Sequence, residues 1–73
     1  MPRPVKISLT IGGHRTSISL EKDFSDELKA MAKGEGISVA KLVRRIDQER
    51  PENDGLSSAV RVAVLRHALR KRL

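Results

Sequence analysis

Two runs of alternating polar and apolar residues meet at a Gly-Gly pair, and this feature constrains the fold of the chain more than any other. Residues 5–11 and 15–20 each alternate with period two, which is the pattern of a strand with one buried face. A Gly12-Gly13 pair between such runs is typical of a two-residue hairpin turn, because the turns that suit a hairpin need positive φ angles. The sequence therefore predicts a β-hairpin over residues 5–20.

The register of this hairpin follows from the turn. If Ile11 pairs with His14, then Ile7 lies opposite Ile18, and the apolar side chains of both runs share one face. A slip by one residue would move them to the wrong face. The other face carries only small polar and cationic side chains: Lys6, Ser8, Thr10, Arg15, Ser17 and Ser19. We expect this polar face to be the functional surface.

Two amphipathic helices are predicted after the hairpin. Residues 21–33 carry acids in the first turns, where the helix dipole favours them, and Gly36 is placed to end this helix in a left-handed conformation. Its apolar residues fall at i, i+4 and i+7: Phe24, Leu28 and Met31. Residues 38–50 form the second helix, with Ser38 as its cap and Pro51 as its stop.

A third helix, over residues 57–71, has apolar residues on two sides. One stripe consists of Val62, Leu65 and Leu69, and the other of Leu56, Val60 and Val64. A helix that is apolar on two sides packs between partners. The chain has no cysteine and one aromatic residue, so a single copy has little material for a core. We therefore expect one domain, residues 1–73, that assembles as a homodimer.

Charge and composition narrow the classes of function. The net charge is +6, and the basic residues concentrate near the strands and the C-terminus, which suits a polyanionic partner or solubility alone. No nucleophile–base constellation is present, and His14 and His67 resemble surface residues more than metal ligands, so we expect no enzyme, metal or cofactor. No run is long and apolar enough for a membrane span and no signal peptide is recognised, so a cytoplasmic location is expected.

The order of motifs resembles a known family. The segment Arg15–Glu21 leads into Phe24 and Leu28, and Gly36-Ile37-Ser38 then precedes Leu42-Val43, as in the ribbon–helix–helix DNA-binding family of Arc and MetJ. The Leu56–Val60 segment is similar to a short bacterial branch with an added C-terminal helix. The resemblance implies an α+β fold and an intertwined homodimer, a regulator of transcription, and a repressor in particular, that inserts a two-stranded ribbon into the major groove of double-stranded DNA.

The resemblance also implies roles for particular residues. Outward side chains of the ribbon would read bases, and here these are Arg15, Ser17 and Ser19. The start of the second helix would bind phosphate through Ile37, Ser38 and Val39, and we expect Lys41 and Lys6 to contact phosphates as well. The two serines are shorter than the family's usual reading residues, so that Arg15 alone can bind guanine in a bidentate manner.

Three alternatives remain open in the sequence. If residues 5–11 pair outside the ribbon, the dimer has four strands and a sheet of about 14 Å, wider than a groove of about 12 Å. The outer strands then twist away, contact the groove walls through Lys6 and Arg3, or serve another purpose. Arg15 could instead be a solvated charge that protects a sheet edge. The dimer could also be an interaction module or antitoxin-like protein whose sheet or third helix docks a protein.

Overall fold

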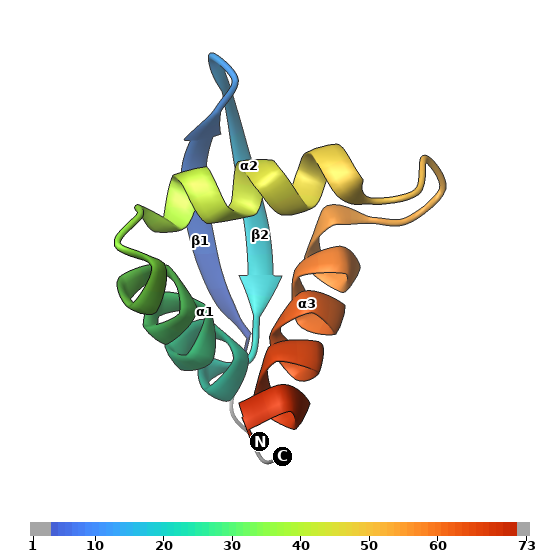
Figure 1. The fold of residues 1–73 in the computed structure, drawn as a ribbon. Coiled ribbons are helices and arrows are strands. Elements are labelled where there is room, and N and C mark those ends of the chain that lie inside the picture. The colour runs from blue at the N-terminus through green and yellow to red at the C-terminus, as the bar shows by residue number, and fades with distance from the viewer. Residues whose placement is uncertain (1–3, 72–73) are drawn as a thin grey trace.

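The chain folds as a β-hairpin followed by three helices (Figure 1). A computed structural model describes residues 4–71, so the expected contact of Arg3 lies outside the described residues. The elements are strands β1 (Val5–Ile11) and β2 (His14–Leu20) and helices α1 (Lys22–Glu35), α2 (Val39–Glu49) and α3 (Leu56–Lys71). This order confirms the predicted α+β fold.

The hairpin has the register expected from its sequence. Ile11 pairs with His14 and Ile7 with Ile18, in one antiparallel sheet of two strands. Gly12 and Gly13 have φ angles of 57° and 83°, which are those of a type I′ turn, where a side chain would be strained. The turn chemistry therefore sets which side chains share a face.

The helix boundaries differ slightly from the expected ones. Helix α1 continues past Lys33 to Glu35, because a glycine inside a helix weakens it without ending it. Gly36 then ends the helix in the left-handed region, as expected, and its N–H donates to the Lys33 carbonyl at 3.1 Å. Helix α3 begins at Leu56, slightly before the expected start.

Helix α2 has the cap that its sequence predicted. The Ser38 hydroxyl accepts a hydrogen bond from the Lys41 N–H at 3.0 Å. At the other end Arg50 adopts an extended conformation, since the following Pro51 disfavours helical geometry in the residue before it.

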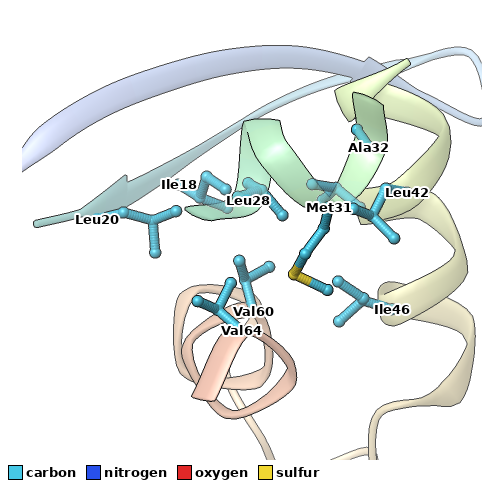
Figure 2. Packing of buried hydrophobic residues seen from close by; sticks show 10 residues of the cluster. Ile18, Leu20, Leu28, Met31, Ala32, Leu42, Ile46, Val60 and Val64 are labelled. Carbon is cyan, nitrogen blue, oxygen red and sulfur yellow. The ribbon is translucent and has the colours of Figure 1, made fainter. Parts of the chain in front are cut away.

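The core lies between the apolar face of the hairpin and the three helices. Figure 2 shows side chains from β2 and from all three helices converging in it. Its buried apolar members are Ile18, Leu20, Leu28, Met31, Ala32, Leu42, Val43, Ile46, Val60 and Val64. Strand β1 contributes only half-buried side chains, so β2 is the strand most firmly held against the helices.

Helix α3 is joined to the preceding elements by ion pairs. The Arg61 guanidinium lies 2.9 Å from Glu21, and its hydrogen bond holds the pKa of that carboxyl below its ordinary value. The Glu27 carboxylate lies 2.9 Å from His67 Nδ1 and 3.4 Å from Lys71 Nζ. Its hydrogen bond with His67, followed by that from Lys71, lowers the pKa of Glu27. His67 is thus half-buried on the side of α3 that faces α1, where it pairs with Glu27.

Over residues 4–71, no helix is both long and apolar enough to cross a bilayer.

Candidate nucleic-acid interface

The polar face of the hairpin is open to solvent along its whole length. Its side chains come from alternate positions of both strands, and all are exposed: Lys6, Ser8, Thr10, Arg15, Ser17 and Ser19. A shallow hollow of about 210 Å³ lies here between the strands, lined by Lys6, Ser8 and residues 15–17. Two cations and several hydroxyl groups therefore lie together with no carboxylate among them, which suits contact with an anionic, hydrogen-bonding surface.

The three expected base-reading residues lie on this face. Arg15 stands opposite Thr10, Ser17 opposite Ser8, and Ser19 opposite Lys6. Small neighbours leave the Arg15 guanidinium free of crowding, and a guanidinium carries donors in a fork that fits paired acceptors. The burial pattern thus separates these side chains from the structural ones, since Ile18 and Leu20 on the opposite face are 1% and 0% exposed.

The expected phosphate-binding residues lie at the start of α2. In Figure 1, α2 crosses the hairpin with its N-terminal end on the β1 side. The Ile37 N–H donates to the Ala32 carbonyl at 3.0 Å and is therefore not free to bind an anion. The first bond inside α2 is from Leu42 N–H to the Ser38 carbonyl, so that the Val39 N–H has no acceptor within the helix.

Two lysines flank these positions. Lys41 is exposed in the first turn of α2, where the helix dipole also attracts anions. Lys6 is exposed on the outer strand β1. Lys6 and the start of α2 therefore lie on the β1 side of the hairpin, and Arg15 lies on β2.

Two residues of α3 that the sequence analysis did not single out form hydrogen bonds with the main chain of β2. The Ser19 N–H donates to the Ser57 hydroxyl at 3.1 Å, and the Ser19 carbonyl accepts from the Arg61 guanidinium at 2.8 Å. Ser57 and Arg61 are four residues apart on α3 and hence lie on one side of that helix. That spacing was visible in the sequence, but nothing local connected it with Ser19.

A polar sheet face that is exposed on one side and packed on helices on the other suits binding of nucleic acid through a β-ribbon. The ribbon-helix-helix domain model matches residues 4–68 of the chain, and the chain belongs to this family. No curated protein and no solved structure matches it. Domains of the family generally bind DNA as dimers in regulators of transcription, and they are typically not enzymes.

Proposed function

We propose that this protein is a cytoplasmic, homodimeric repressor of transcription that reads a specific site in double-stranded DNA. The observation that carries the proposal is the exposed face of the hairpin, where Arg15 and Lys6 stand among hydroxyl groups with no acid beside them. A β-ribbon fits the major groove, and groove-facing side chains there can distinguish all four base pairs.

Strand β1 limits how two copies can form such a ribbon. With β1 on one edge of β2, only the other edge of β2 is open to its twin, and the dimer then has four strands with the two β2 strands in the middle. Four strands span about 14 Å, against a groove of about 12 Å. Because sheets twist, the β2 pair enters the groove and the outer β1 strands turn toward its walls.

The chemistry of the face divides the DNA contacts into two kinds. Arg15, on a central strand, donates two hydrogen bonds to guanine O6 and N7, whereas Ser17 and Ser19 make less selective contacts. Lys6, Lys41 and the N–H groups at the start of α2, from Ser38 and Val39, bind phosphates on the flanks. Specificity thus depends on Arg15, while affinity depends on the flanking cations.

The experiment that tests this function is selection of bound sites from random duplex DNA. We expect an enriched sequence with twofold symmetry and a guanine at matching positions of both half-sites, because one Arg15 comes from each copy. The matched control is Arg44→Ala, which removes an exposed cation from α2 without altering the hairpin face. This control should enrich the same sequence. Failure to enrich any sequence at low salt would contradict the proposal. Enrichment of single-stranded contaminants would also contradict it, because the natural target would then be a single-stranded nucleic acid and not duplex DNA.

A further inference from the structure

The open edge of β2 offers fewer hydrogen-bonding groups than its length suggests. In the hairpin, the residues next to the two-residue turn exchange hydrogen bonds, and bonded and non-bonded pairs then alternate. The main-chain groups of Thr16 and Ile18 therefore face β1, and those of Arg15, Ser17 and Ser19 face away from it. These three residues make up the open edge.

Helix α3 already forms hydrogen bonds with one of these three residues of the open edge. Both main-chain groups of Ser19 are bonded to α3, the N–H to Ser57 at 3.1 Å and the carbonyl to Arg61 at 2.8 Å. Arg61 is itself held by Glu21, at 2.9 Å, so this cover over the edge is anchored to the start of α1. Only Arg15 and Ser17 remain free to pair with another strand.

We propose that α3 sets the register of the dimer: two copies pair through β2 with Arg15 of each opposite Ser17 of the other. This inference rests on the homodimer of the proposed function. The pairing uses both free residues of both copies and gives four hydrogen bonds. Placing Ser17 opposite its twin would bring Arg15 against the occupied Ser19, and placing Arg15 opposite its twin would bring Ser17 against Gly13 in the turn. Each of these alternatives keeps only two hydrogen bonds.

The ends of the strands agree with this register. Strand β2 begins at His14, which stands opposite Ile18 of the second copy when Arg15 stands opposite Ser17. The second copy's strand therefore ends just before it reaches Ser19, and the α3 side chains over that residue meet no strand.

The exposed stripe of α3 continues the same surface. Positions four apart form a ridge along a helix, and the ridge through Ser57 and Arg61 leads to Leu65 and Leu69. Leu65 and Leu69 are 52% and 51% exposed, and Val62 beside them is 42% exposed. Each partner of a stable interface buries roughly 800 Å². A ribbon with only four hydrogen bonds covers much less area than this, so the dimer needs a further contact surface. We therefore assign the stripe to the second copy, as the apolar part of the interface.

A groove beside the stripe has room for side chains of that copy. It measures about 370 Å³ and lies between the end of α2 and α3. Its lining is mixed, with apolar side chains such as Ile46, Val62 and Ala63 beside the charged Glu49, Arg50, Asp54 and Arg66. An apolar stripe with a partly charged groove beside it matches an interface that has an apolar centre and a polar rim.

Single cysteines report the register directly, because the natural chain has none. In the proposed register Thr16 lies opposite its own twin as a non-bonded pair, with Cα atoms about 4.5 Å apart, a separation that a disulfide spans. We expect Thr16→Cys to form a disulfide dimer rapidly under mild oxidation. Ser17→Cys should cross-link at least tenfold more slowly, and the control Ser8→Cys, on the outer strand β1, should not cross-link.

Variants of α3 test its part in setting the register. Ser57→Ala combined with Arg61→Ala frees Ser19, so that Ser17→Cys in this background should cross-link faster than in the natural one. Circular dichroism checks that the double variant keeps its helices. If the helices are lost, Ser57→Ala alone, which frees the N–H of Ser19, replaces the double variant in the cross-linking assay. Leu65→Asp should give a folded monomer in sedimentation, whereas Ala30→Asp, at an exposed position of α1 outside the stripe, should remain a dimer.

The outcomes separate the register from the function. Preferential cross-linking through Ser17→Cys or Arg15→Cys with DNA binding intact would overturn the register and leave the proposed function standing. A Leu65→Asp protein that stays dimeric would assign the stripe to a different partner and overturn its place in the interface. A natural protein that sediments as a monomer and binds no DNA would overturn both proposals.

Discussion

Replacing Ile18 by alanine should destabilise the protein far more than replacing its neighbour Ser17. Ile18 is 1% exposed in the core, whereas Ser17 lies on the open face of the same strand. Removing three carbons costs about 2.4 kcal/mol at roughly 0.8 kcal/mol for each, and the cavity adds to this, so we expect about 3–4 kcal/mol. Ser17→Ala should stay within about 0.5 kcal/mol, since it removes no buried contact.

The expected loss is large against the whole stability of the chain. At roughly 0.05–0.15 kcal/mol per residue, a chain of 73 residues is stable by about 4–11 kcal/mol. Urea denaturation followed by circular dichroism, at one protein concentration because a dimer's stability depends on it, measures both variants. The melting temperature of Ile18→Ala should fall by more than about 10 °C. Equal losses for the two variants, or a larger loss for Ser17→Ala, would show that the faces of the strand are reversed.

Further variants test other parts of the structure. Leu42→Asp should abolish the cooperative thermal transition, because it places an unpaired charge at a residue that is 0% exposed. Ser38→Ala should cost about 1 kcal/mol in urea denaturation because the α2 cap is removed, and an unchanged midpoint would contradict that role. The pKa of Glu21 is lowered in the folded protein by Arg61, so its stabilisation is present above the ordinary carboxyl pKa and is lost as the pH falls through the folded value. Glu21→Gln should therefore be less stable than the natural protein near neutral pH and should approach it in acid; a constant difference would refute the pairing. DNA affinity should fall linearly with log salt, and Lys6→Ala should make the slope shallower by about 0.9 for each phosphate that Lys6 neutralises, which titrations at several salt concentrations measure.

The hairpin and the core were predictable because their signals are local. Alternation around Gly12-Gly13 fixed the register and separated Ile18 from Arg15, and the expected pairing is the observed one. The cap of α2 was equally visible, since Ser38 precedes an amphipathic run. Helical periodicity identified the two stripes of α3, of which one is buried through Val60 and the other is exposed.

The contacts of α3 could not be predicted because they join distant parts of the chain. Arg61 and Glu21 are 40 residues apart, as are His67 and Glu27, and no local pattern links them. For the same reason the sequence did not predict the hydrogen bond from the Ser19 N–H to the Ser57 hydroxyl. At the start of α2, three candidate phosphate donors were expected, but the turn that ends α1 uses the N–H of Ile37. The residues on each face followed from periodicity, whereas their hydrogen bonds depended on the tertiary structure.

Base reading by the hairpin is tested most directly by the binding of Arg15→Ala to two DNA duplexes, the selected site and a scrambled sequence of the same length and composition. We expect affinity for the selected duplex to fall by about 1–3 kcal/mol per half-site, because a bidentate hydrogen bond to guanine is removed. Affinity for the scrambled duplex should fall much less, since only a charge disappears there, and the melting temperature should not change, since the side chain is exposed. Equal weakening on both duplexes would contradict base reading by Arg15 and would reduce the polar face of the hairpin to an electrostatic contact.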